Sequence, residues 1–216
     1  VESTDIITLN HEVLEYVSRG GLKLEKALND FNIDLTNKTM LDIGSSTGGF
    51  TDCALKHNIK EVICVDVGSN QLDKSLRKNE KVHVFENTDI RNFDNLLLST
   101  VNLITIDISF ISVTKIINKL STINAKEIIC LIKPQCGKTI ADKYKGIVLD
   151  KEVHENVIKN VVNAFKEINY NLKNITFSPV KGGNGNIEYL AYFTNEEINS
   201  TINFKDLVST TFKTMK

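Results

Sequence analysis

The sequence predicts an α/β fold: a seven-stranded, mostly parallel sheet that ends in an antiparallel hairpin. Two observations lead to this prediction. Short apolar runs rich in Ile, Val and Leu alternate with helix-like segments for most of the chain, a pattern typical of parallel strands buried on both faces. Near the end of the chain, two further strand-like runs are joined by a link too short for a parallel crossover. We therefore expect helices on both faces of one sheet.

Five short apolar runs are expected to form the parallel strands, because strands buried on both faces lack the polar alternation of a solvent-facing strand. The runs are Thr39–Gly44, Glu61–Val67, Val82–Glu86, Val101–Asp107 and Glu127–Lys133. The helical segments between them supply the long connections that parallel pairing needs.

Helical segments are expected before, between and after these runs. The first precedes the sheet and repeats apolar residues at Leu24, Ala27, Leu28 and Phe31, a stripe suited to covering one sheet face. The longest runs from about Asp150 to Ile168, with Asp150 as its N-cap. The others are Gly49–Lys56, Asn70–Lys78 and Ser112–Leu120.

The end of the chain breaks the alternation. Leu172–Ser178 and Ile187–Thr194 have strand character and are separated only by the glycine-containing loop Pro179–Asn186. Such a short link makes the two strands antiparallel. Five parallel strands followed by an antiparallel hairpin fit the sheet of class I methyltransferases better than that of a dinucleotide dehydrogenase.

Composition excludes several classes of protein. The chain has 216 residues, of which 41% are hydrophobic and 25% charged, and its formal net charge is -1. These proportions exclude a disordered chain and a small disulfide-stapled protein. No stretch approaches the roughly 18 apolar residues of a membrane span, and the first 20 residues are acidic rather than basic, unlike a secretion signal. We expect a cytoplasmic protein without membrane contact.

Cysteines and histidines do not indicate a metal site. Cys53, Cys64, Cys130 and Cys136 lack CxxC spacing, and all but the last lie within apolar or helical patterns, so we expect reduced core cysteines. The four histidines form no HExxH pair. The balanced charge argues against coating by a polyanion but leaves room for a local nucleic-acid site.

The most informative segment is LDIGSSTGGF at residues 41–50, which leads from a buried strand through a turn of small residues into a helix. Glycine leaves backbone amides uncovered at such a helix start, so that a ligand can approach them. A dinucleotide fingerprint starting at Gly44 would require glycine at position 46, where Ser46 stands. This departure weakens an NAD site; a tight turn without a ligand is the alternative.

Two aspartates follow the next two strands. Asp66 comes 22 residues after Gly44, where an acidic side chain accepts hydrogen bonds from ribose hydroxyls, and Asp89 is suited to an adenine amino group. Both residues could instead cap helices. Taken together with the order of strands, they favour an adenosyl ligand.

Six motifs, in order over residues 16 to about 195, resemble the TlyA (hemolysin A) family. They are YVSRGGLKL at 16–24, LDIGSSTGGFT at 41–51, DVG at 66–68 with QL at 71–72, DISFIS at 107–112, KPQ at 133–135 and GNIEY at 185–189. One departure is that Cys136 directly follows Gln135, where the family usually has two more residues, Phe and Glu. Another is Ser69-Asn70, where Tyr-Gly is common in the family.

The resemblance implies a Rossmann-like class I enzyme that transfers a methyl group from S-adenosylmethionine to a ribose 2′-oxygen of ribosomal RNA, in cytidine. Residues 16–216 would form the FtsJ-like catalytic domain, and residues 1–15 a remnant or linker after an N-terminal RNA-binding domain. The partners would be ribosomal RNA or ribosomal subunits. The expected cofactor residues are Asp42, Gly44, Ser45, Ser46, Gly48, Gly49, Phe50, Asp66, Val67, Asp89 and Asp107.

Sheet geometry alone brings four charged residues together. Asp107 and Lys133 end two parallel strands at the carboxyl edge, where doubly wound sheets bind ligands. Glu188 begins an antiparallel strand at the same edge, and Lys23 lies off the apolar stripe of the first helix and can face that edge from outside. The set matches the Lys-Asp-Lys-Glu tetrad of FtsJ-like enzymes. The alternative is a group of ordinary surface charges beside strand ends.

The chemistry suggests a role for each tetrad residue. A ribose 2′-hydroxyl must lose its proton as it attacks a methyl group, so we expect Lys133, with a lowered pKa, to take that proton or to stabilise the alkoxide. Asp107 would orient this lysine and the methyl donor, while Lys23 and Glu188 would position the ribose.

Basic residues around this edge are candidates for RNA phosphate contacts, although a solvated charged face is the alternative. They are Arg19, Lys138, Lys143, Lys145 and Lys181. Two other functions compete with an enzyme: a membrane-active cytolysin, which would need an apolar span or a basic amphipathic helix, and a non-catalytic RNA-binding module.

Overall fold

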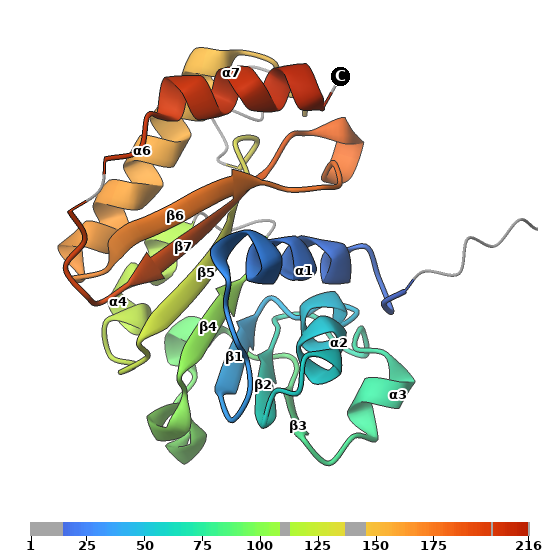
Figure 1. The fold of residues 1–216 in the computed structure, drawn as a ribbon. Helices are drawn as coiled ribbons and strands as arrows, with labels where there is room; N and C mark the ends of the chain where they lie inside the picture. The colour runs from blue at the N-terminus through green and yellow to red at the C-terminus, as the bar shows by residue number, and fades with distance from the viewer. Residues whose placement is uncertain (1–14, 109–112, 137–145, 200, 216) are drawn as a thin grey trace, which may run out of the picture.

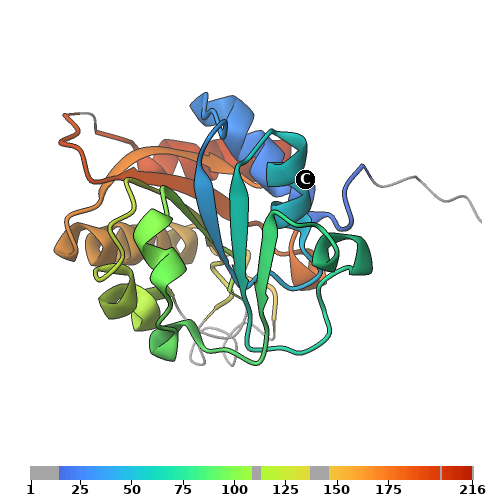
Figure 2. The ribbon, with the colours of Figure 1, turned by 90° about the horizontal axis from the view of Figure 1, so that it is seen from below.

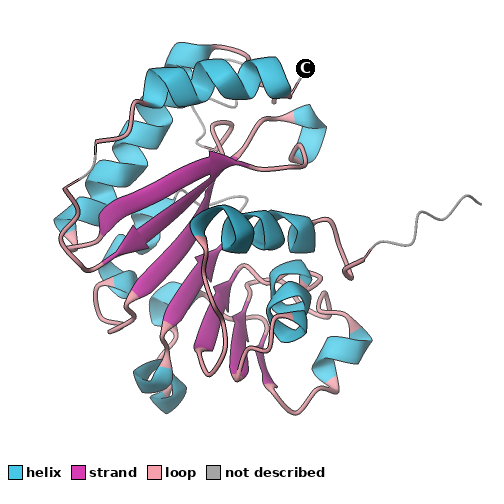
Figure 3. Cartoon of the chain, in the orientation of Figure 1, coloured by secondary structure: helices cyan, strands magenta, loops and turns pink. Residues whose placement is uncertain are grey.

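The computed structural model describes residues 15–108, 113–136, 146–199 and 201–215. Within these ranges seven strands form one sheet in the order β3-β2-β1-β4-β5-β7-β6 (Figures 1 and 3). The strands are β1 Thr39–Ile43, β2 Glu61–Val65, β3 Val82–Phe85, β4 Leu103–Ile106, β5 Glu127–Ile132, β6 Asn171–Phe177 and β7 Tyr189–Thr194. Strands β1 to β5 pair in parallel, and β7 is antiparallel to both β5 and β6. The predicted sheet is confirmed.

Helices cover both faces of the sheet (Figure 2). Those of the described residues are α1 Gly20–Phe31, α2 Gly49–Lys56, α3 Lys74–Arg77, α4 Ile117–Leu120, α6 Lys151–Glu167 and α7 Phe204–Thr214. Side chains of α1, α2 and α3 pack into one hydrophobic cluster, and those of α4, α6 and α7 into another. Short 3-10 helices are η1 Ile90–Asn92, η2 Leu96–Thr100, η3 Val113–Ile116 and η4 Gly183–Gly185.

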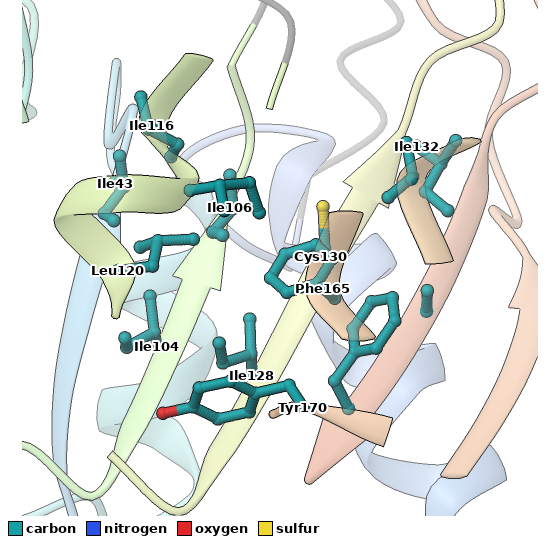
Figure 4. Packing of buried hydrophobic residues seen from close by; sticks show 14 of the residues in the cluster. Ile43, Ile104, Ile106, Ile116, Leu120, Ile128, Cys130, Ile132, Phe165 and Tyr170 are labelled. Atoms are coloured by element: carbon teal, nitrogen blue, oxygen red, sulfur yellow. The ribbon is translucent and has the colours of Figure 1, made fainter. Parts of the chain in front are cut away.

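The sheet is apolar on both faces because alternate residues of its strands enter different clusters. Leu41 and Ile43 of β1 face the α4–α6 side, whereas Met40 faces α1. On the α4–α6 side, Phe165 of α6 stacks on Phe193 of β7 with ring centroids 4.1 Å apart, among the isoleucines of the central strands (Figure 4). Two-sided burial explains the continuous apolar runs in the sequence.

The third helix is much shorter than the predicted Asn70–Lys78. The carboxylate of Glu86, just after β3, accepts hydrogen bonds from the backbone N–H groups of Asn70, Gln71 and Leu72. These donors are therefore held outside a helix until Asp73 caps Lys74–Arg77. The segment predicted as Ser112–Leu120 begins outside the described residues and continues as η3 and α4.

The prediction also missed α7, which packs on α6 (Figure 1). Cys53, Cys64 and Cys130 are buried free thiols, as expected, and Cys136 is partly exposed. None of the helices in the described ranges combines the length and apolar character needed to cross a membrane. Residues 1–14, in the segment expected to be a remnant or linker, lie outside the described residues.

Candidate active site

Two adjoining cavities lie at the carboxyl edge of the parallel strands. The larger has a volume of about 620 Å³ and the smaller about 270 Å³. Gly44, Ser46 and Asp107 line both cavities and so form their common wall. Strands end one to two residues earlier than predicted, so Asp66, Asp107 and Lys133 stand just beyond the sheet.

The loop after β1 approaches β4 closely. A Cβ atom on Gly44 would lie 2.4 Å from the carbonyl oxygen of Asp107, and Gly44 has a φ of 80°. Only glycine fits this position without displacement of the backbone. Ser45, Gly49 and Phe50 line the larger cavity. Gly48 lines neither cavity, and its backbone packs against Leu72 and Leu76 beside α3.

Asp66 organises the wall of the smaller cavity. Its carboxylate accepts hydrogen bonds from the backbone N–H of Ser46 at 2.8 Å and of Gly68 at 2.7 Å. A carboxylate has about four acceptor positions, so two hydroxyl donors can still be accommodated. Val67 lines the same cavity and is 63% exposed. This geometry suits a ribose.

Asp89 lines the smaller cavity, but its carboxylate is already engaged. It caps η1 through the backbone N–H of Arg91 and forms an ion pair with the Arg91 guanidinium. The helix-cap alternative therefore applies to Asp89, whereas Asp66 caps no helix of the described chain. The structure gives no support to Asp89 as a free acceptor for an adenine amino group.

Asp42 lies beneath the loop. Its carboxylate accepts hydrogen bonds from the hydroxyls of Thr51 at 2.7 Å and Thr105 at 3.0 Å, and the residue is 1% exposed. Burial raises the pKa of Asp42 to about 6. Asp42 thus braces β1, α2 and β4 from below at the base of the larger cavity.

The four residues of the expected tetrad form a connected set of charges. Lys133 forms an ion pair with Asp107, whose other oxygen lies 3.9 Å from the ammonium of Lys23. Lys23 in turn donates to Glu188 at 2.7 Å. The order of contacts is Lys133–Asp107–Lys23–Glu188, and all four residues line the larger cavity. Lys23 is only 8% exposed, so it lies within the site rather than facing it from outside.

The expectation of a lowered pKa for Lys133 is wrong for the protein alone. Burial by itself would lower the pKa of this ammonium, but the charge and hydrogen bond of Asp107 outweigh burial, and the pKa is raised. Lys133 therefore carries a proton at neutral pH. It holds Asp107 in place and presents a positive charge to the cavity.

Glu188 stands one residue before β7, not within it. It is 2% exposed and also accepts from the side-chain amide of Gln135 at 2.9 Å. A Cβ atom on Gly182 would lie 2.1 Å from the Glu188 carboxylate, so the hairpin loop lies directly against this side chain. Asn186 closes the loop by donating to the carbonyl oxygens of Gly146 and Gly183.

This geometry agrees with a match between residues 16–195 and the model of the FtsJ-like methyltransferases. The chain belongs to the FtsJ-like methyltransferase family.

The relatives are similar over most of the chain. YqxC of Bacillus subtilis is 44% identical over 192 residues, which cover 86% of this chain and 68% of that protein. The 23S rRNA (cytidine-2′-O)-methyltransferase TlyA of Campylobacter jejuni is 41% identical over 180 residues, covering 82% and 70%. A crystal structure of a hemolysin-named protein from Lactococcus lactis has 40% identity, covers 91% of this chain and 98% of that one, and has a TM-score of 0.82. The resemblance to the TlyA family is confirmed.

FtsJ-like methyltransferases take the methyl group from S-adenosylmethionine, which is the cofactor of this chain. The smaller cavity fits its adenosine part, since Asp66 offers acceptors to the ribose and Ile90 and Ile116 add apolar walls. Glycine backbone at Gly44 lets the ligand approach the wall shared with the larger cavity. When bound, the cofactor supplies an electrophilic methyl group on a positively charged sulfur.

Sequence reasoning missed two residues that line the larger cavity and a third, Glu86, that holds a neighbouring loop. Gln135 lies in the motif KPQ at 133–135 and Asn186 in the motif GNIEY at 185–189, so a role for both residues could have been predicted from the sequence. Glu86 has no motif, and its contacts with residues 70–72 arise only in the folded chain.

The basic rim is partly described. Arg19, just before α1, and Lys181, in the loop between β6 and β7, both line the larger cavity. Lys138, Lys143 and Lys145 lie outside the described residues.

Proposed function

We propose that this protein methylates the 2′-oxygen of a ribose in ribosomal RNA, with cytidine as the target nucleotide. The observation that carries the proposal is the chain of contacts Lys133–Asp107–Lys23–Glu188 along the larger cavity. Asp107 also borders the smaller cavity, so a hydroxyl held by these charges would face the methyl donor. Proximity of this kind contributes much of the rate in group transfer.

Charges of the site suit a developing alkoxide. Lys23 and Lys133 present two ammonium groups against Asp107 and Glu188, and both lysines are largely removed from water. In such a site a fixed positive charge stabilises a partial negative charge on the attacking oxygen far more than it would in water. Lys133 serves as this stabilising charge, and as the proton acceptor once its own proton has been lost.

The relatives support ribosomal RNA as the substrate. The Campylobacter jejuni relative is named a 23S rRNA (cytidine-2′-O)-methyltransferase, and this chain covers 70% of it at 41% identity. Arg19 and Lys181, at the rim of the cavity, would contact phosphates on either side of the target nucleotide. A non-catalytic RNA-binding module would have no need for buried ion pairs at the wall between two cavities.

The test is transfer of a tritiated methyl group from S-adenosylmethionine to ribosomal particles taken at several assembly stages, followed by mapping of the labelled nucleotide. A 2′-O-methylcytidine at one position is expected. Asp107→Asn should abolish the label, because the variant loses the charge that joins Lys133 to Lys23. Label on a base rather than a ribose, or undiminished label with the variant, would contradict the proposal. Lysis of washed red cells by the purified protein would instead favour a cytolysin.

A further inference from the structure

The side-chain oxygen of Gln135 is a buried acceptor that has no hydrogen-bond partner among the described residues. Gln135 lies two residues beyond Lys133 and lines the larger cavity. An acceptor buried without a donor loses its hydration and gains nothing in return, and native proteins keep few such groups. This oxygen therefore calls for a donor beyond the described residues, and a ligand in the larger cavity can supply one.

The orientation of the Gln135 amide is fixed by its neighbours. Its Nε2 donates to Oε1 of Glu188 at 2.9 Å, and Oε2 of Glu188 accepts from Lys23 at 2.7 Å. An ionised carboxylate only accepts, so the NH₂ group must face Glu188 and the oxygen must face away. Gln135, a residue of the cavity wall, consequently keeps its oxygen as a fixed acceptor and cannot rotate to present a donor in its place.

Gln135 also stands away from the reacting end of the site. Asp107 lines both cavities, whereas Gln135 and Glu188 line only the larger one. The contacts run in the order Asp107–Lys23–Glu188–Gln135, so two side chains stand between Gln135 and Asp107 along this chain of contacts. A nucleotide whose 2′-oxygen reaches Asp107 would direct another part of itself, its base, toward Gln135.

We propose that Gln135 reads the target base by accepting a hydrogen bond from the exocyclic amino group of cytosine. This inference rests on the proposed function. Cytosine presents an N4 amino donor at the position where uracil presents the O4 acceptor. With uracil, the O4 acceptor would face the side-chain oxygen of Gln135, and neither oxygen could donate a hydrogen bond to the other. A site built to hydrogen-bond a polar group of its substrate rejects an analogue that leaves the site's own polar group unpaired. Gln135 is thus a specificity-determining residue.

The experiment compares methylation rates on three RNAs that carry cytidine, uridine or pyrimidin-2-one riboside at the mapped position; the last lacks any group at carbon 4. We expect the wild type to favour cytidine over both others by about tenfold or more. In Gln135→Met, an apolar substitution of similar length, cytidine and pyrimidin-2-one should react equally. Gln135→Lys keeps a donor toward Glu188 but removes the acceptor, so uridine should overtake cytidine.

Three results would overturn the inference. The first is a wild type that methylates cytidine and uridine equally, and the second is a Gln135→Met variant with the wild-type preference. The third is an equal loss on all three RNAs in both variants, which would mean that Gln135 only positions Glu188. Thermal unfolding and calorimetric binding of S-adenosylmethionine should stay unchanged in both variants, because Gln135 does not line the smaller cavity. A wild type that methylates no RNA would overturn the proposed function itself, whereas methylation blind to the base overturns the inference alone.

Discussion

Lys133 is held by Asp107 in its protonated state, because the carboxylate raises its pKa. A lysine that must accept a proton from a hydroxyl has first to lose its own. An added positive charge nearby lowers the pKa of an ammonium, so occupation of the neighbouring cavity by a cationic ligand favours that loss. Lys133 can therefore pair with Asp107 as a cation in the protein alone and act as a base once a cationic ligand occupies the neighbouring cavity.

We expect Lys133→Ala to reduce single-turnover methyl transfer by about 10² to 10⁴, because it removes a general base together with a stabilising charge. Lys133→Arg should not restore the rate, since a guanidinium keeps its proton at every working pH. Wild-type single-turnover rates should rise about tenfold per pH unit between roughly pH 6 and 8, as the neutral lysine becomes more abundant.

An arginine variant within tenfold of the wild type, or a rate that is flat with pH, would leave Lys133 as an electrostatic contact only. Calorimetry with S-adenosylmethionine serves as the control: Lys133 itself does not line the smaller cavity, and the measurement shows whether Asp107, its ion-pair partner, still holds its place there.

Asp66 and Asp89 line the same cavity but differ in their remaining hydrogen-bonding capacity. Asp66 has acceptor positions left beyond its two backbone contacts, whereas Asp89 is engaged by Arg91. We therefore expect Asp66→Ala to weaken S-adenosylmethionine binding at least tenfold and Asp89→Ala to weaken it much less. Isothermal titration calorimetry measures S-adenosylmethionine binding by both variants, and NAD serves as the negative control. Equal losses in the two variants, or comparable NAD binding, would contradict this assignment.

At the scale of elements, the loop between β6 and β7 offers a matched pair of glycines. A Cβ on Gly182 would lie 2.1 Å from the Glu188 carboxylate, whereas one on Gly183 would meet nothing within 4 Å. Glu188 is held by Lys23 and Gln135, so it can give way only by breaking these contacts. We expect Gly182→Ala to lower the methylation rate at least tenfold and Gly183→Ala to leave it within twofold.

Circular dichroism of the two glycine variants should match the wild type, because the φ of Gly182 is -71° and any residue adopts it. Similar activity in both variants would show that the hairpin loop does not set the position of Glu188.

Strand positions were predictable because the periodic signal is strong: both faces of the sheet are covered, so β1 is buried along its whole length. Strand order brought Asp107, Lys133 and Glu188 to one edge without any knowledge of side chains. The length of α3 was not predictable, because Glu86, distant in sequence, withdraws three backbone donors from the helix. Tertiary contacts override local propensity there.

The helix α7 was predictable but went unrecognised. Asn203 accepts from the backbone N–H groups of Lys205 and Asp206, and apolar residues recur at Phe204, Leu207 and Val208. The pKa of Lys133 was beyond the reach of the sequence, because its direction depends on how closely Asp107 approaches a buried ammonium.

At the scale of the whole molecule, the site sits where the two halves of the sheet diverge. The chain leaves β1 toward β2 and β3 on one side, while β4 and β5 lie on the other. Such a switch point leaves a crevice beyond the strand ends, into which loops from both halves converge. Here Gly44 and Ser46 come from the loop after β1, and Asp107 follows the end of β4. The parallel pairing of β1 with β4 therefore assembles the wall between the two cavities.

Asp42 lies in the centre of this assembly, and its buried carboxylate makes folding stability depend on pH. Burial raises its pKa from 3.8 to about 6 in the folded chain. A carboxyl whose pKa is raised by folding contributes its full stability below the unfolded value, near pH 4, and that contribution is lost as pH rises through 6. A shift of this size corresponds to about 3 kcal/mol. Asp42→Asn removes the titration while keeping one acceptor for Thr51 or Thr105.

We therefore expect the free energy of unfolding of Asp42→Asn, relative to the wild type, to increase between pH 4 and pH 8 by up to about 3 kcal/mol. Urea unfolding at several pH values measures this difference. The comparison is internally controlled, because any pH-independent cost of the altered hydrogen bonds is the same at both ends and cancels. Parallel stability curves for the two proteins would mean that Asp42 titrates alike in the folded and unfolded chain. A growing difference would show that this α/β fold gives up stability at neutral pH to keep a charged carboxylate beneath its cofactor loop.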